Sequence, residues 1–179
     1  MRDSAARLGF TFDHHTARNE LQAATFRLRE ARRVRLLLSC SGHFAVETSP
    51  PPAPFAGPAT VAIRPLPVPP ADLRLCHKTS ARGFYDEARR AAGTDEVVFE
   101  HDGQLTEGSF TSLFVPRADG MLVTPPLGQG LLPGVLRGEL IATGRAVEGP
   151  VRRADLAGGF FIGNAVRGLC AATLVAGAE

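Results

Sequence analysis

The sequence predicts an α+β protein with two parts, and three patterns along the chain support this. A helical pattern and then two strand patterns occupy the residues before Pro50. Nine of the 14 prolines lie between Pro50 and Pro70, where they make the chain stiff and extended. Short strand patterns alternate with helical patterns after them. We therefore expect a small N-terminal domain over residues 1–70, which ends in this proline-rich linker, and a larger domain over residues 71–179.

The N-terminal part begins with a helix and a β-hairpin. Asp13 is a suitable N-cap for a helix that carries one apolar stripe and ends near Ala31. The stripe consists of Ala17, Leu21, Ala24 and Leu28. Residues 34–39 and 43–48 have the composition of two strands joined by a turn, and residues 61–63 suggest a third strand.

The C-terminal part combines two helices with short strands. The helices are expected over residues 82–92 and 135–143, and Pro133-Gly134 opens the second. Asp-Gly pairs at 102–103 and 119–120 mark turns. The predicted strands lie at residues 96–100, 112–115, 121–124, 159–162 and 171–175.

The composition argues against several classes of function. The formal net charge is +2 and the arginines are interspersed with acids, so no basic stripe indicates nucleic-acid binding. The apolar runs are too short to span a bilayer, and the first residues lack a signal-peptide pattern. The three cysteines and five histidines lack metal-ligand spacing. We expect a cytoplasmic protein that binds no nucleic acid, membrane or metal.

Among its 20 basic residues the chain has 19 arginines and one lysine, Lys78. Arginine replaces lysine as a surface charge, but its guanidinium cannot act as a nucleophilic amine. An amine that attacks a carbonyl forms a Schiff base with a carbonyl substrate or with pyridoxal phosphate. A chance survivor on the solvated surface also explains a single lysine, so the neighbouring motifs must decide between the two.

Four segments after the linker carry candidate chemistry. Lys78 lies in the first, and Glu107 lies in the second among small and apolar residues. A carboxylate that faces a pyridine nitrogen keeps a pyridoxal ring protonated, whereas a solvated turn acid is the plain alternative. In the third segment, glycines precede a helix that starts near Gly134, and its unpaired N–H groups favour an anion such as phosphate.

The fourth segment is an apolar strand that runs into Gly163-Asn164. An asparagine at a strand end is placed to donate to a phosphate, and Arg167 is a candidate for a substrate carboxylate. A plain turn explains the Gly-Asn pair equally well, and a surface ion pair explains the arginine.

In this order and spacing the four segments resemble the class IV aminotransferase family of fold-type IV pyridoxal phosphate enzymes, and most closely its aminodeoxychorismate lyases. They read His-Lys-Thr (77–79), Leu-Thr-Glu-Gly-Ser-Phe-Thr-Ser-Leu-Phe (105–114), Gly-Leu-Leu-Pro-Gly-Val-Leu-Arg (130–137) and Gly-Asn-Ala-Val-Arg-Gly (163–168). The resemblance implies a two-domain fold like that of D-amino acid aminotransferase, with a larger β-barrel-like C-terminal domain with helices. The small N-terminal α/β domain is expected to be incomplete, because relatives usually have a segment before the position of Met1.

The resemblance also implies roles for individual residues. Lys78 would be the catalytic residue that forms the Schiff base with pyridoxal 5'-phosphate, and Glu107 would bind the pyridine nitrogen. The backbone amides of Val135 and Leu136, with the side chain of Asn164, would hold the phosphate.

For the substrate, the resemblance implies a small molecule, with Arg82 and Arg167 as candidate binding residues. A lyase of this family converts 4-amino-4-deoxychorismate to 4-aminobenzoate and pyruvate in folate biosynthesis. A class IV transaminase of branched-chain or D-amino acids shares nearly all of these residues, so the motifs separate the two poorly. A truncated, non-catalytic member is a third alternative. We expect the protein to form a homodimer.

Overall fold

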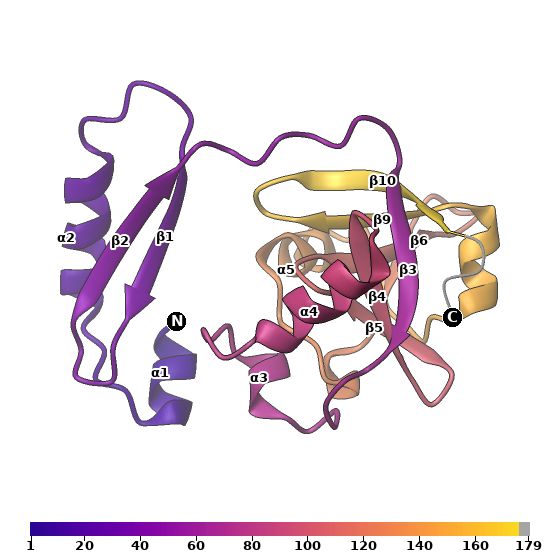
Figure 1. The fold of residues 1–179 in the computed structure, drawn as a ribbon, viewed down its shortest axis with the longest axis horizontal. Coiled ribbons are helices and arrows are strands. Elements are labelled where there is room, and N and C mark those ends of the chain that lie inside the picture. The colour runs from indigo at the N-terminus through magenta and orange to yellow at the C-terminus, as the bar shows by residue number, and fades with distance from the viewer. Residues whose placement is uncertain (176–179) are drawn as a thin grey trace. The chain divides into compact units, whose positions relative to one another are not determined.

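The structure, a computed structural model, describes residues 1–175 and divides into two compact units (Figure 1). The first unit comprises Met1–Ala53, and the second begins at Pro54. The division lies within the first proline cluster, earlier than the end of the N-terminal domain that the sequence suggested. As a result, the strand around residues 61–63 belongs to the second unit.

The first unit consists of two helices and a β-hairpin. Its elements are α1 (Arg2–Leu8), α2 (His14–Thr25), β1 (Arg33–Leu38) and β2 (Phe44–Ser49). The strands pair antiparallel, which confirms the predicted hairpin. Asp13 caps α2 as predicted and accepts a hydrogen bond from the backbone N–H of Thr16 at 2.7 Å. The predicted helix end near Ala31 is wrong. Only Ala17 of the apolar stripe is buried, and a helical extension without packing gains little stability.

The second unit contains the remaining elements. They are β3 (Ala59–Pro65), α3 (Leu73–Cys76), α4 (Gly83–Ala92), β4 (Glu96–His101), β5 (Gln104–Gly108), β6 (Ser112–Pro116), β7 (Leu122–Thr124), the 3-10 helix η1 (Leu127–Gln129), α5 (Val135–Ala142), β8 (Ala146–Glu148), the 3-10 helix η2 (Arg153–Gly158), β9 (Phe160–Asn164) and β10 (Gly168–Leu174). Each strand and helix predicted for this part is present with shifted ends. β5 was not predicted, because its buried residues include the polar Thr106 and Glu107.

Among the described residues, six strands of the second unit close into a barrel in the order β5, β4, β3, β10, β9 and β6. The barrel closes where β6 returns to β5, through the register pair Glu107 and Ser112. β3 runs parallel to its neighbours β4 and β10, and the other barrel pairs are antiparallel. β7 and β8 extend the sheet from β6. This architecture confirms the predicted α+β class and the barrel-like C-terminal domain.

Alternating side chains of the barrel strands pack into separate apolar clusters, as the two-residue period of a strand requires. One cluster is enclosed by the barrel and includes Val61, Ile63, Val98, Leu113 and Ile162. The intervening residues pack outward. Val97 and Phe99 contact Tyr85 of α4, and Phe114 packs with Leu140 of α5. The barrel therefore fixes α4 and α5 on its outer surface, where Figure 1 shows them.

Gly130, which follows η1, lets the backbone pass close to the linker. Its φ is +78°, and a Cβ atom there would lie 2.5 Å from the carbonyl oxygen of Pro70. We expect Gly130→Ala to lower the free energy of unfolding by at least about 2 kcal/mol, because left-handed strain and a backbone clash add together. Gly144 has a similar φ of +67° with no atom within 4 Å of the added Cβ, so Gly144→Ala should cost only the strain, about 1 kcal/mol.

Urea denaturation measures the free energy of unfolding of both variants. The fluorescence of Tyr85 reports the unfolding of the second unit, because the chain has one tyrosine and no tryptophan. An equal decrease in the free energy of unfolding in the two alanine variants would contradict the clash at Gly130.

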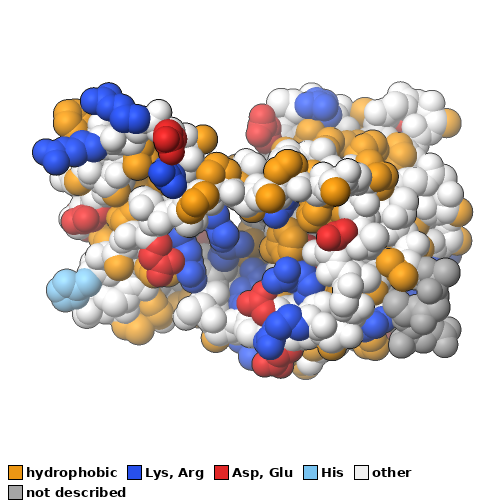
Figure 2. Space-filling view, turned by 45° about the horizontal axis from the view of Figure 1, so that its top comes forward, with side chains coloured by type: hydrophobic (Ala, Val, Ile, Leu, Met, Phe, Trp, Pro, Cys, Tyr) orange, Lys and Arg blue, Asp and Glu red, His pale blue; other side chains and the backbone are white. Residues whose placement is uncertain are grey.

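The described surface carries both signs of charge. On the face drawn in Figure 2, basic side chains occur at several separate places, and acidic side chains lie among them. Within residues 1–175, no helix is long and apolar enough to cross a membrane.

Candidate active site

Glu107 lies near the end of β5, in the register pair that closes the barrel, and its side chain is 5% exposed. Its Oε1 atom accepts hydrogen bonds from the guanidinium of Arg82 at 3.0 Å and from the hydroxyl of Tyr85 at 2.8 Å. Its Oε2 atom accepts from the backbone N–H of Leu132 at 3.0 Å. Donors from α4, from the residue before it and from the loop before α5 therefore fix both carboxylate oxygens.

Burial raises the pKa of Glu107 above its ordinary value. The Arg82 charge is the largest of the opposing effects, followed by the hydrogen bonds from Tyr85 and Leu132 and the charge of Lys78. The pKa of Tyr85 is also raised, first by burial and then by the negative charge of Glu107, so its hydroxyl keeps its proton and donates. The ion pair with Arg82 and the two further donors favour the ionised carboxylate against the cost of its burial.

Lys78 is exposed and lies in the short segment between α3 and α4. The backbone N–H of Thr79 donates to the carbonyl of His77 at 2.9 Å, which places Lys78 at the centre of a three-residue turn. Its positive charge is among those that lower the pKa of Glu107. The structure therefore brings the lone lysine and the buried carboxylate into one electrostatic neighbourhood.

Asp72 caps α3, the helix immediately before this turn. Hydrogen bonds from the side chain and backbone of Arg74 lower the pKa of Asp72 from 3.8 to about 2. The stabilisation from Asp72 is therefore fully present above pH 3.8 and is lost as the pH falls through about 2.

We expect Arg74→Gln to return the pKa of Asp72 toward 3.8 in an NMR titration of the carboxyl group. A pKa that stays near 2 in this variant, as it should in the control Arg90→Gln, would contradict the assignment.

α5 begins beside the barrel-closing pair. A Cβ atom built on Gly134 would lie 3.0 Å from the hydroxyl oxygen of Ser112, the partner of Glu107 in that pair. Gly134 is the N-cap of α5 and provides no side-chain cap, so the N–H groups of Val135 and Leu136 have no partner within the helix. The helix N-terminus predicted to face a phosphate thus lies next to the buried carboxylate.

Asn164, at the end of β9, also meets the loop that follows Glu107. Its side-chain amide donates to the carbonyl of Phe110 at 3.1 Å. Its side-chain oxygen accepts from the backbone N–H groups of Val166 and Arg167, each at 3.0 Å, and so closes the turn between β9 and β10. A primary amide has a second N–H, and this one donates to no described residue.

The two arginines expected to bind substrate have partners within the protein. Arg82 pairs with Glu107 at 3.0 Å, and its side chain is only 12% exposed. The guanidinium of Arg167 lies over the ring of Phe55 at 4.5 Å from its centre, and 5.9 Å from that of Phe110. Arg82 therefore supports the buried carboxylate, a role that the sequence did not indicate, and Arg167 stacks on aromatic rings.

The geometry unites all four segments that the sequence singled out, and comparison with known proteins assigns them to a family. A family model described as amino-transferase class IV matches residues 1–175. The chain belongs to the class IV aminotransferase family. Enzymes of this family depend on pyridoxal phosphate.

Three relatives illustrate the range of class IV aminotransferases that the chain resembles. A crystal structure from Mesorhizobium loti, provisionally named an amino-acid aminotransferase, has 37% sequence identity and a TM-score of 0.88, and the match covers 97% of this chain and 87% of that one. A Schizosaccharomyces pombe protein provisionally named aminodeoxychorismate lyase is 27% identical over an alignment of 188 positions, gaps included, which covers 98% of this chain and 80% of that protein. A Thermotoga maritima protein provisionally named branched-chain-amino-acid aminotransferase is 37% identical over 57 residues, only 32% of this chain and 20% of its own.

The side chains of this member of the class IV aminotransferase family fit pyridoxal phosphate. The amine of Lys78, the buried carboxylate of Glu107 and the uncapped start of α5 occupy one neighbourhood. The hydroxyl oxygen of Thr79, next to Lys78, is buried and has no hydrogen-bond partner among the described residues, which is consistent with a polar ligand at this position. In the described part of the chain, no group of three or more His, Cys, Asp or Glu side chains is placed to hold a metal ion.

Two residues that support the site were not predicted. Tyr85 is the only tyrosine in a chain with 11 phenylalanines, so the compositional argument that singled out Lys78 would also have found this hydroxyl. Glu96 is completely buried at the start of β4 and binds the turn that follows Glu107. Apart from a carboxylate at the start of an apolar strand, no sequence signal marks Glu96.

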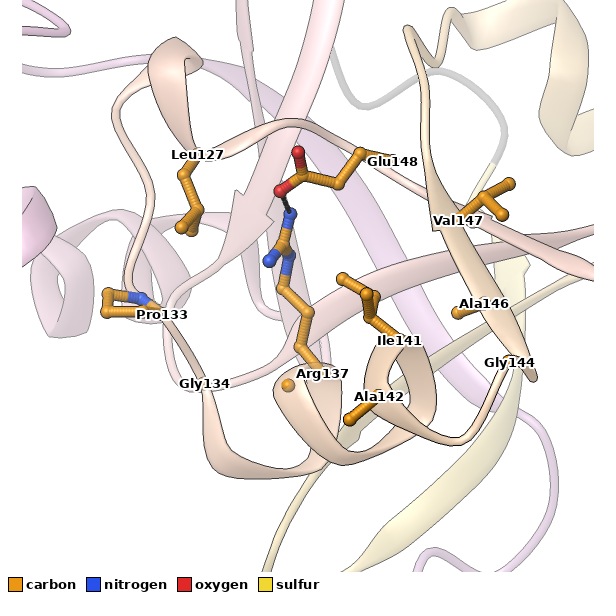
Figure 3. A pocket seen from close by; sticks show the side chains of 11 residues that line it. Leu127, Pro133, Gly134, Arg137, Ile141, Ala142, Gly144, Ala146, Val147 and Glu148 are labelled. Carbon is orange, nitrogen blue, oxygen red and sulfur yellow. Dashed lines mark hydrogen bonds and ion pairs between the residues drawn. The ribbon is translucent and has the colours of Figure 1, made fainter.

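A pocket of about 730 Å³ lies between α5 and β8, and it shares Pro133 and Gly134 with the loop beside the site (Figure 3). Arg137, which is 3% exposed, extends from α5 along this pocket to the carboxylate of Glu148 and donates to the carbonyl of Pro125 at 2.8 Å. Lys78 and Glu107 do not line it. The Arg137 contacts therefore anchor α5, whose N-terminus belongs to the candidate site.

Proposed function

We propose that this chain is a pyridoxal phosphate-dependent aminodeoxychorismate lyase, which converts 4-amino-4-deoxychorismate to 4-aminobenzoate and pyruvate in folate biosynthesis. The observation that carries the proposal is the buried carboxylate of Glu107, which accepts hydrogen bonds from Arg82, four residues after Lys78, and from Leu132, in the loop before α5. The name of the Schizosaccharomyces pombe relative, which matches 98% of this chain, supports the choice of a lyase.

In this proposal Lys78 and Glu107 have different roles in the reaction. Bound pyridoxal phosphate supplies a ring that accepts the electron pair left when a proton leaves the amine-bearing carbon of the substrate. Lys78 would supply the amine that attaches the cofactor. The substrate amine would displace Lys78, and the freed Nζ atom would then remove that proton. Glu107 would bind the pyridine nitrogen, and Arg82 and Tyr85 hold its carboxylate in place.

The phosphate group would be held by the start of α5. The N–H groups of Val135 and Leu136 lie at the positive end of the helix dipole, which favours an anion. The amide of Asn164 would add one further donor. Arg167 is proposed to bind a carboxylate of the small-molecule substrate, whereas Arg82 is proposed to act through Glu107. We also propose that the protein acts as a homodimer.

Two other functions compete with the lyase. The Mesorhizobium loti structure, at 37% identity, carries the name of an amino-acid aminotransferase, which favours a transaminase of branched-chain or D-amino acids as the second candidate. A transaminase would use Lys78 to return the proton to the cofactor rather than to release pyruvate. A non-catalytic member of the family is the third candidate.

Product analysis distinguishes the three. The purified chain with pyridoxal phosphate is incubated with 4-amino-4-deoxychorismate and no amino acceptor, and 4-aminobenzoate and pyruvate are quantified. We expect equal amounts of the two products, and none with Lys78→Arg. Products that form only from an amino acid and a 2-oxo acid would overturn the lyase in favour of a transaminase. An absence of turnover in both assays, under conditions where the cofactor is bound, would indicate a non-catalytic member.

A further inference from the structure

Glu96 is a buried carboxylate, and hydrogen bonds alone offset the cost of its burial. It is 0% exposed, and no cation pairs with it within residues 1–175. Burial raises its pKa, and the hydrogen bonds oppose that rise. Five donors surround the carboxylate, namely Val97 N at 2.8 Å, Ser109 N at 3.0 Å, Ser109 Oγ at 2.5 Å, Phe110 N at 3.2 Å and Thr111 Oγ1 at 2.8 Å. A fully satisfied polar group of this kind specifies one local geometry.

Four of these five donors belong to residues 109–111, in the tight connection between β5 and β6. Glu107 lies just before this connection and Ser112 directly after it, and together they form the pair that closes the barrel. Gly108 makes the contact with Glu96 feasible, since a Cβ atom there would lie 2.8 Å from the Oε2 atom of Glu96. The same Cβ atom would lie 2.4 Å from Thr111 Oγ1.

We propose that Glu96 is a positioning residue for the active site. Its carboxylate holds the turn over residues 109–111, and the turn fixes the direction of Glu107 and the place of Ser112 beside the start of α5. The inference rests on the proposed function for what Glu107 is positioned to bind, but its structural effect is testable without a cofactor.

A glutamine at position 96 preserves size and shape but cannot reproduce the contacts. If its amide nitrogen replaces Oε2, it faces the backbone N–H of Phe110. If it replaces Oε1, it faces the N–H groups of Val97 and Ser109. A backbone N–H is always a donor, so either orientation opposes donor to donor. Glu96→Gln should therefore release the turn while filling the same volume.

The matched control is Glu100→Gln, on the same strand, because Glu100 pairs with Arg153 at 2.8 Å and does not touch the turn. The first readout is amide hydrogen exchange at Ser109 and Phe110 in the cofactor-free protein. The second is the near-ultraviolet absorbance and circular dichroism of Tyr85, the only tyrosine, whose hydroxyl donates to Glu107 at 2.8 Å. A movement of Glu107 changes this hydrogen bond directly.

We expect Glu96→Gln to speed exchange at both amides at least tenfold and to shift the Tyr85 spectrum, with neither change in Glu100→Gln. Exchange within twofold of the parent protein would overturn the proposal. Faster exchange with an unchanged Tyr85 spectrum would also overturn it, because the turn would then not position Glu107.

If Glu96→Gln does not fold, Ser109→Ala removes one donor and should give at least threefold faster exchange at Phe110 with a smaller spectral shift; no change would overturn the proposal. Failure of the parent protein to bind pyridoxal phosphate would reject the proposed function alone, since both readouts are taken without cofactor.

Discussion

Replacing Lys78 by arginine is expected to abolish covalent attachment of pyridoxal phosphate. Arginine keeps the positive charge near Glu107, but a guanidinium does not form the imine that a lysine amine forms. Because Lys78 is the only lysine, the variant has no side-chain amine at all. After incubation with pyridoxal phosphate and reduction with borohydride, the parent chain should gain one pyridoxyl group in the mass spectrum, on the peptide that contains Lys78.

The control introduces an amine elsewhere. Arg90 is exposed on α4, and Arg90→Lys gives the chain a second lysine outside the site. The label should remain on Lys78 in this variant, because the amine at position 90 lies outside the site that is proposed to hold the ring and the phosphate. Equal labelling of both lysines would mean that attachment needs no binding site. Stoichiometric labelling of the Lys78→Arg chain at a position other than the Met1 α-amine would also contradict the assignment.

Truncation of Glu107 is expected to destabilise the second unit strongly. Glu107→Ala leaves the guanidinium of Arg82, which is 12% exposed, without its counter-charge, and it leaves the Tyr85 hydroxyl and the Leu132 N–H without an acceptor. Removing one partner of a buried ion pair costs about 3–5 kcal/mol. We expect a decrease of this size in the free energy of unfolding, measured by urea denaturation with far-ultraviolet circular dichroism.

A double-mutant cycle that combines Glu107→Ala with Arg82→Met measures the coupling energy between Arg82 and Glu107. The free energy of unfolding should decrease less in the double variant than the sum of the decreases in the single variants, because no unpaired charge remains buried. The pair Arg153 and Glu100, in which the arginine is exposed and the glutamate is half-buried, is the control, and its coupling should be about 0–1 kcal/mol. Additive decreases in the free energy of unfolding for the Arg82 and Glu107 variants would show that the ion pair does not support the carboxylate.

Local signals predicted most elements of the fold. The cap at Asp13 and the Asp-Gly turns act within a few residues, so they can be identified without knowledge of the tertiary structure. β5 was missed because its polar residues face partners that lie far away in the sequence, such as Tyr85 and Leu132 for Glu107. The end of α2 depends on packing that the apolar stripe does not reveal.

In the candidate site, too, local signals predicted some residues, and the roles of others depend on partners far away in the sequence. Lys78 and Glu107 were marked by composition and by motif, and the structure places them in one neighbourhood. Arg82 was expected to bind substrate, because a sequence does not show that its guanidinium reaches Glu107 across 25 residues. Glu96 had no motif, since its donors belong to a turn that only the barrel brings beside it.

The most direct test of the assembled site is the visible absorbance of the chain during titration with pyridoxal phosphate. If Lys78, Glu107 and the start of α5 form one site, a new band should appear and saturate at one cofactor per chain. The band should be absent in Lys78→Arg, and its pH dependence should change in Glu107→Gln, because the pyridine nitrogen loses its carboxylate partner. A parent chain that develops no saturable band, or a band that is identical in both variants, would contradict the account.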